Sequence, residues 1–263
     1  MKTNTLKLIK YQLRDVMRSR WVLFYLAFFI LITDALFRFG GSGDRVILSL
    51  MNVVLLVIPL VSIMLGTMYV YNSREYTELM LSQPVKRGEM FSALFAGLML
   101  PLSATVAVGI ALPFIWNGVL FTHLAALGYL IGTAIILTTI FSALAFMIAL
   151  LTEDKTKGLG LAVVMWLFFA VIYDGLILVV IYMFSDYPLQ QPVLIMSMLN
   201  PLDLARIALL IEFEASTLMG FTGALFQRFL GSTGGLLTIT GVLLMWIALP
   251  LSWGARRFVT KDF

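Results

Sequence analysis

Six long apolar runs, separated by shorter polar stretches, dominate this chain. They cover residues 21–38, 46–71, 90–116, 124–151, 158–184 and 235–253. A helix needs about 20 predominantly apolar residues to cross the hydrocarbon core of a bilayer, and each run is long enough for one crossing. The pattern predicts an all-α integral membrane protein with six transmembrane helices, built as a single domain over residues 1–263.

Two further segments are expected to form helices that do not cross the membrane. In the first twenty residues, basic positions lie beside an apolar face, which predicts an amphipathic helix at the membrane interface. Residues 185–234, between the fifth and sixth runs, contain enough apolar positions to predict short external helices in or near the interface.

Composition agrees with lipid as the main solvent of the surface. Of the 263 residues, 61% are hydrophobic and 12% are charged, and the mean hydropathy is +1.00. The net charge of +4 lies at the ends of the apolar runs rather than in one patch, which argues against nucleic-acid binding. The chain has no Cys, and His123 is its one histidine, so neither a thiolate site nor a zinc site can be built from it.

The basic residues indicate the orientation. Fourteen of the 18 Lys and Arg residues lie in the N-terminal segment, the loops after the second and fourth runs, and the C-terminal tail. Because Lys and Arg near the span ends are retained in the cytoplasm, both termini are expected there. The sequence thus predicts a multi-pass protein of the cytoplasmic (inner) membrane.

The loop after the second run reads REYTELMLSQPVKRGE over residues 74–89. It predicts a short helix with Glu75 and Glu78 in its early turns, ended by Pro84. Such a helix would present Leu79 and Met80 to a partner. An ordinary interfacial loop, anchored by basic residues, is the alternative.

Charged residues also occur within or beside the apolar runs. Asp174 lies near the middle of the fifth run, where an exposed carboxylate costs several kcal/mol, so it must face protein or water. Tyr173 or Tyr182 are the expected partners for a structural contact, and an ion path is the alternative. Asp34 and Arg38 are spaced for a local ion pair.

The segment 200–214 predicts an external docking site. Asn200 and Pro201 suit the cap and first turn of a helix, which continues with Asp203 and Arg206. Its apolar side is expected to rest in the membrane interface. Acids at its end, Glu212 and Glu214, oppose the helix dipole and would favour a basic periplasmic partner. A lid that only seals the outer vestibule is the alternative.

Motifs for chemistry are missing. No GxxxxGK[ST], HExxH or GxSxG sequence occurs, so the chain is not expected to be an enzyme, and any ATPase must be a separate subunit. Gly128 and Gly132 permit close helix approach. The 15 Met residues are assigned to packing rather than to copper.

Taken together, these features resemble the permeases of exporter-type ABC transporters. The basic amphipathic start, the six runs and the loop at 74–89 carry this resemblance. It sharpens at GLGL (158–161), at Asp174, at NPLD with Arg206, and at the acid-flanked phenylalanine of 212–214. In these features the chain is similar to the permeases that serve nitrous oxide reductase maturation.

The resemblance implies that the loop is a coupling helix for an ATPase. The implied coupling residues are Arg74, Glu75, Glu78, Leu79, Met80, Pro84 and Arg87. Two permease copies would pair with two ATPase subunits, which hold the ATP and Mg, and a periplasmic accessory protein would sit on the outer face during copper-site assembly. Without Cys and with one His, this chain is expected to transmit force rather than hold copper or another cofactor. A proton-coupled secondary transporter using Asp174 is the alternative, although such proteins usually have internal repeats.

Overall fold

The structure is a computed structural model that describes residues 2–83, 85–185, 190–213 and 233–260, and all regular elements in these ranges are helices. They are α1 (Lys2–Met17), α2 (Arg20–Gly40), α3 (Gly43–Asn72), α4 (Arg74–Leu81), α5 (Arg87–Trp116), α6 (Leu124–Leu151), α7 (Lys155–Leu167), the π-helix η1 (Phe168–Ile172), α8 (Tyr173–Met183), α9 (Gln190–Met198), α10 (Pro201–Glu212) and α12 (Thr233–Thr260).

Six of these helices are long and apolar enough to cross a membrane, which confirms the predicted all-α membrane fold. They are α2, α3, α5, α6, the continuous α7–η1–α8 helix and α12. Their ends differ from the ends of the apolar runs. Helix α12, for example, continues to Thr260 although its apolar run ends at residue 253, because backbone hydrogen bonding continues past the hydrocarbon boundary and Arg side chains reach back to water.

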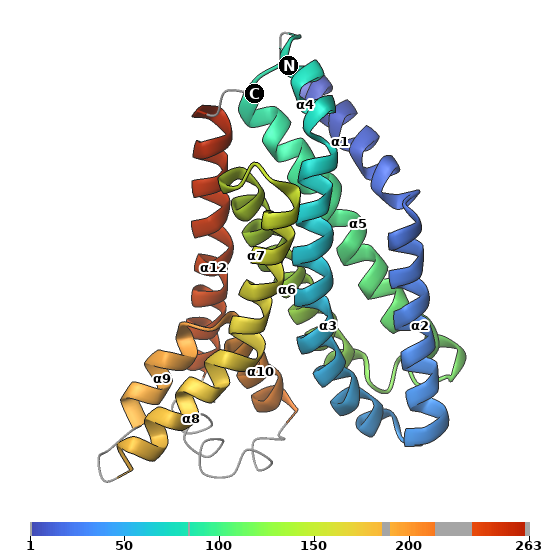
Figure 1. Ribbon diagram of the computed structural model, residues 1–263. Coiled ribbons are helices and arrows are strands. Elements are labelled where there is room, and N and C mark those ends of the chain that lie inside the picture. The colour runs from blue at the N-terminus through green and yellow to red at the C-terminus, as the bar shows by residue number, and fades with distance from the viewer. Residues whose placement is uncertain (1, 84, 186–189, 214–232, 261–263) are drawn as a thin grey trace.

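The elements divide between two ends of the helical bundle. Helix α1 begins, α12 ends and α4 lies at one end, here called the termini end, whereas α9 and α10 lie at the opposite end (Figure 1). This arrangement follows from an even number of crossings. A bend of 112° separates the two short helices, so they form a corner rather than a straight span.

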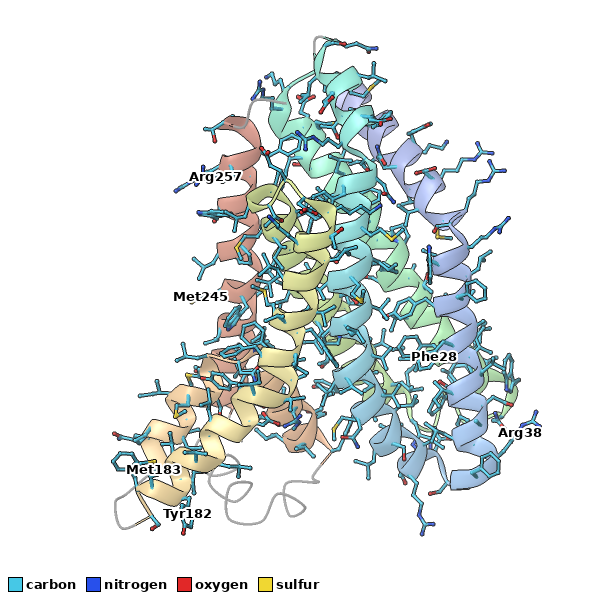
Figure 2. The ribbon with its side chains drawn as sticks, in the orientation of Figure 1. Phe28, Arg38, Tyr182, Met183, Met245 and Arg257 are labelled. Carbon is cyan, nitrogen blue, oxygen red and sulfur yellow. The ribbon has the colours of Figure 1, made fainter. Side chains whose placement is uncertain are left out.

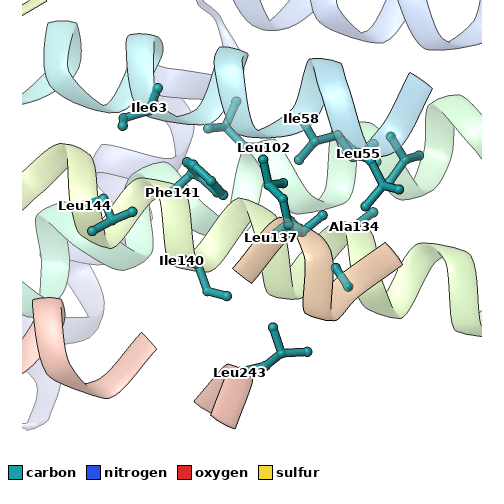
Figure 3. Close-up of a cluster of buried hydrophobic side chains, with 14 of the residues drawn as sticks. Leu55, Ile58, Ile63, Leu102, Ala134, Leu137, Ile140, Phe141, Leu144 and Leu243 are labelled. Carbon is teal, nitrogen blue, oxygen red and sulfur yellow. The ribbon is translucent and has the colours of Figure 1, made fainter. Parts of the chain in front are cut away.

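Helix α6 lies at the centre of the bundle, packed between α3, α5, α10 and α12. Its Leu137, Ile140 and Phe141 are fully buried, and in Figure 3 Ile140 points toward Leu243 of α12, on the side of α6 opposite α3. A Cβ on Gly66 of α3 would lie 2.7 Å from the Cβ of Ala145, so these two helices touch almost backbone to backbone. In lipid such close van der Waals contact, rather than removal from water, holds helices together.

Helix α1 packs along α5 instead of resting only on a membrane surface. Gln12 is buried, a side chain at Gly97 would collide with it, and the Tyr69 hydroxyl donates to its Oε1 over 2.7 Å. Arg14 remains exposed on the opposite face. The predicted amphipathic helix therefore exists, and its less polar face is fixed to the bundle.

The fifth span lies at the edge of the bundle. Only 6% of its most apolar window is buried, against 78% for α6. Its first part, α7, packs on α3, and α8 diverges from the bundle toward α9 (Figure 1). Gly158 marks the closest approach, since any side chain there would collide with the Tyr71 ring, whose hydroxyl donates to the Thr152 carbonyl over 2.9 Å.

Candidate functional site

The loop at 74–89 forms the predicted helix, α4, which starts immediately after α3. Asn72 ends α3, and Ser73 caps α4 through its carbonyl, which accepts from the backbone and hydroxyl of Thr77. The helix ends at Leu81. Pro84, expected to end it, lies outside the described residues. Because α3 and α4 share one residue as their junction, a displacement of α4 acts directly on α3.

The outward face of α4 differs in part from the prediction. Leu79 is 66% exposed, and Glu75 is exposed as well. Met80, however, packs against the buried core, so the prediction that it projects to a partner is wrong. It follows Leu79 by one position, which turns it about 100° around the helix toward the bundle. Glu78 accepts from Arg74 over 3.2 Å within the helix.

Neighbouring elements hold α4 in place. Its Tyr76 ring stacks on Tyr11 of α1, with 5.6 Å between centroids. Burial, with Tyr11 adding to the effect, raises the pKa of the Tyr76 hydroxyl. Beyond the loop, Arg87 Nη1 donates to the Val259 carbonyl over 2.9 Å and so joins α5 to α12. Helices α1, α4, α5 and α12 thus form one connected platform at the termini end.

At the opposite end lies a charged cluster that joins the fifth span to α10. Arg206 Nη1 is 3.0 Å from Asp174 Oδ2 and 3.4 Å from Asp203 Oδ1. The expectation that Tyr173 or Tyr182 would be the partner of Asp174 is wrong, because the Tyr173 hydroxyl donates to the Met196 carbonyl and Tyr182 is 84% exposed.

Asn200 connects two elements, α10 and η1, at this end. Its Oδ1 accepts from the Leu202 N–H over 3.0 Å and caps α10, as predicted, while its Nδ2 donates to the Phe169 carbonyl of η1 over 2.9 Å. A π-helical turn is wider than an α-helix and has a different hydrogen-bond pattern. The Phe169 carbonyl in this turn can therefore accept a hydrogen bond from Asn200, which lies outside the helix. Asn200 itself is fully buried.

The burial of this cluster corrects the predicted docking surface. Asn200, Pro201 and Asp203 are all buried, so these side chains cannot meet a partner protein. The apolar side of α10 also faces inward, against α6, α3 and α12, instead of the membrane interface. Of the two acids expected to complete the site, Glu212 is half-buried at the helix end, and Glu214 lies outside the described residues.

Other sequence predictions have simple outcomes. Asp34 and Arg38 form the expected ion pair at 2.8 Å, and the Trp116 indole adds a hydrogen bond to Asp34. Gly128 and Gly132 face open space, so their spacing brings none of the described helices close. Within the described part of the chain, no three His, Cys, Asp or Glu side chains gather as a metal site.

Two contacts were not predicted from the sequence: the ion pair of Asp174 with Arg206 and the hydrogen bond from Asn200 to Phe169. Both join positions about 30 residues apart, which local sequence patterns do not relate.

Comparison with known proteins agrees with this architecture. The family model described as "ABC-2 family transporter protein" matches residues 6–263. A curated relative from Pseudomonas aeruginosa, named "Probable ABC transporter permease protein NosY", is 25% identical over 229 residues, covering 80% of this chain and 82% of the relative. A protein of the same name from Stutzerimonas stutzeri is 26% identical over 223 residues, covering 78% and 80%.

A family match over nearly the whole length excludes the proton-coupled secondary transporter as the general class. Six spans, the helix α4 at the termini end, and the two NosY relatives agree with the predicted resemblance. This chain therefore belongs to the ABC-2 transporter family and is the membrane-spanning permease subunit of an ABC transporter.

Proposed function

We propose that this permease couples ATP hydrolysis on a separate ATPase subunit to conformational work across the membrane, in the maturation of nitrous oxide reductase. The observation that carries the coupling is the position of α4. It exposes Leu79 and Glu75 at the termini end, and it is joined through Ser73 to α3. An apolar knob beside an acid is suited to a complementary groove on a partner protein.

The internal contacts of the bundle favour transmission of force. Helix α4 stacks on α1 through Tyr76 and Tyr11, and α3 packs tightly on the central α6. On the far side, α6 and α3 both touch α10, which is tied to the fifth span through Arg206 and Asp174. Packed helices move as units, so a shift of α4 has a continuous route to the opposite end.

The role in reductase maturation rests on the resemblance to the NosY relatives. In this proposal two permease copies pair with two ATPase subunits, both termini are cytoplasmic, and a periplasmic protein contacts the outer end. Since the chain has no Cys and one His, copper would be handled by the partner proteins rather than by this subunit.

The test is co-purification and ATP turnover with the partner ATPase subunit. Leu79→Asp places a charge in the proposed apolar contact and should reduce both ATPase association and permease-dependent turnover at least about tenfold, the scale of one interface anchor. Gln83→Asp, at an exposed polar position in the same loop, is the matched control and should leave both unchanged. Unchanged association of the Leu79→Asp variant would contradict the coupling role of α4.

The link to the reductase is tested separately. Deleting the permease gene should leave nitrous oxide reductase present but without its complete copper site, as measured by metal content and by its optical spectrum. A fully loaded reductase in the deletion strain would contradict the assignment while leaving the ATPase coupling intact.

A further inference from the structure

Two adjoining cavities separate the α1–α2 corner from the C-terminal half of α3. The cavity at the termini end measures about 190 Å³, and its polar lining includes Asp15, Ser19, Asn72 and Ser73. The second measures about 490 Å³ and lies between α2 and α3, further along these helices from the termini end. Trp21, Leu65 and Met68 line both cavities, so the two cavities adjoin, and together they are here called the α2–α3 groove.

The chemistry of the groove changes along its length. Its deeper part is walled by Phe24 and Phe28 of α2 (Phe28 is labelled in Figure 2) and by Val61 and Met64 of α3. Tyr25, also in this wall, has a buried hydroxyl without a hydrogen-bond partner among the described residues. A polar entrance above an apolar channel suits a ligand with a polar head and a hydrocarbon tail.

The length of the groove distinguishes a lipid from a protein helix. On α3 the apolar part of the groove extends from Met68 to Val57, which is about 16 Å at the rise of 1.5 Å per residue. This is close to half of the roughly 30 Å hydrocarbon core. A spanning helix from a second copy would require a groove through the full depth, whereas an acyl chain of one leaflet requires half. The groove therefore fits a lipid of the leaflet at the termini end.

The charges at the entrance define the headgroup. Asp15 lines the polar cavity, and its carboxylate has no ion pair within the described ranges. Arg18 and Arg20 flank Ser19, which lines the same cavity, and both are exposed without an ion pair to any described residue. Guanidinium groups favour a phosphate, and a carboxylate favours a primary ammonium that can donate hydrogen bonds to it. Both charges occur together in an aminophospholipid.

We propose that the α2–α3 groove binds one phosphatidylethanolamine-type phospholipid from the leaflet at the termini end. Arg18 and Arg20 hold the phosphate, Asp15 holds the ammonium, and one acyl chain lies between the aromatic side chains of α2 and the aliphatic side chains of α3. Asn72 and Ser73, at the groove entrance, lead directly into α4. The lipid would thus fill the space beside the root of this helix, whichever partner α4 binds.

The test uses the purified full-length chain in phosphatidylcholine vesicles that contain a few per cent of a phosphatidylethanolamine with a photoreactive acyl chain. After illumination, lipid adducts are mapped by peptide mass spectrometry. Labelling of Phe24, Val61 and Met64 should exceed that of Leu31, which is 68% exposed on α2 outside the groove, by about tenfold, equivalent to 1.4 kcal/mol. Equal labelling at both places would show only ordinary contact with bulk lipid and would overturn the proposal.

Variants separate the tail from the head. Met64→Trp fills the groove and should abolish the excess labelling, whereas Leu31→Trp, the matched control, should preserve it. Phe24 is 70% exposed, so Phe24→Ala should not impair folding. Because it removes one wall of the groove, it should also reduce the excess of lipid labelling. Asp15→Asn should remove the preference for ethanolamine over choline headgroups while leaving chain labelling in place. Labelling unaffected by Met64→Trp and Phe24→Ala would contradict binding of the acyl chain in the groove. Equal labelling by ethanolamine and choline lipids in the unmodified chain would contradict binding of the ammonium by Asp15.

A second copy in the groove is the competing outcome. Since the chain has no cysteine, a single Phe24→Cys variant can be oxidised in membranes. Efficient disulfide-linked dimers, together with absent lipid adducts, would assign the groove to the partner copy and overturn the proposal. Monomeric Phe24→Cys protein that still forms lipid adducts at Val61 and Met64, reduced only as far as in Phe24→Ala, is the expected result.

Discussion

The Arg206 guanidinium lies 3.0 Å from the carboxylate of Asp174, although 32 residues separate them in the chain. The same nitrogen lies 3.4 Å from Asp203, and the second oxygen of Asp203 is buried without a partner among the described residues. The Arg206 guanidinium therefore neutralises two carboxylates. The connection between the fifth span and α10 depends on this one cation.

Arg206→Gln should lower thermal stability in detergent more than Asp174→Asn does, because it leaves two carboxylates facing each other without a cation. The double variant should recover part of the loss. Both partners of the Arg206–Asp174 pair are about a third exposed, so solvent screening limits the coupling energy to about 1 kcal/mol. Strictly additive losses in the double-mutant cycle would indicate that the two residues do not interact.

Asn200 is expected to be the most sensitive polar residue at the end opposite the termini. Asn200→Ala removes a cap and a buried donor to the Phe169 carbonyl, which should cost about 2–4 kcal/mol for the two bonds together. Asn200→Ser keeps an uncharged oxygen that can cap α10 and loses only the donor to η1, so it should cost less. Denaturation monitored by Trp fluorescence would rank them. Equal losses for both variants would argue against the cap, and no loss for the second variant would argue against the bond to η1.

The two glycines of the GLGL motif should behave differently. Gly158→Ala places a methyl group against the Tyr71 ring and should push α7 away from α3, at a cost of about 1–3 kcal/mol for overpacking. Gly160→Ala meets no atom within 4 Å and should be neutral or slightly stabilising, because Ala favours helix over Gly. Melting temperatures of the matched pair test this, and equal effects would contradict the close approach at Gly158.

The acids of α4 are not equivalent. Glu75 is exposed and forms no ion pair with the described residues, whereas Glu78 is already paired with Arg74. Glu75→Lys should therefore weaken ATPase binding more than Glu78→Lys does, by several-fold for a rim charge, and the difference should shrink at high salt. Binding measured at two ionic strengths would reveal it. A larger effect of Glu78→Lys would mean that the partner breaks the pair within the helix.

Single cysteines can establish the orientation. Gln83 and Phe121 are exposed residues of loops at the two ends of α5, Gln83 preceding it and Phe121 following it. A cysteine at Phe121 should react with an impermeant thiol reagent in intact cells, and one at Gln83 should react only after permeabilisation. The reverse pattern would invert the proposed topology, including the leaflet of the α2–α3 groove.

Local chemistry allowed much of the fold to be predicted. Hydrophobic length alone identifies the six spans, the spacing of Asp34 and Arg38 predicts their pair, and Asn200 with Pro201 predicts the start of α10. Helix α4 was also predicted, since its acids and the following proline mark a short helix. Each of these depends on residues within about one or two helical turns, or on the count of apolar residues in one helix.

Which surface each apolar face meets was decided only by the tertiary structure. The sequence predicts that α10 has an apolar side but not that this side packs on α6, α3 and α12, burying Asp203 and leaving Arg206 to join Asp174. In a soluble protein an apolar face must point inward. In a bilayer, lipid chains and the side chains of a neighbouring helix are equally apolar, so hydrophobicity does not distinguish a buried face from an exposed one, and only the packing of the whole bundle does.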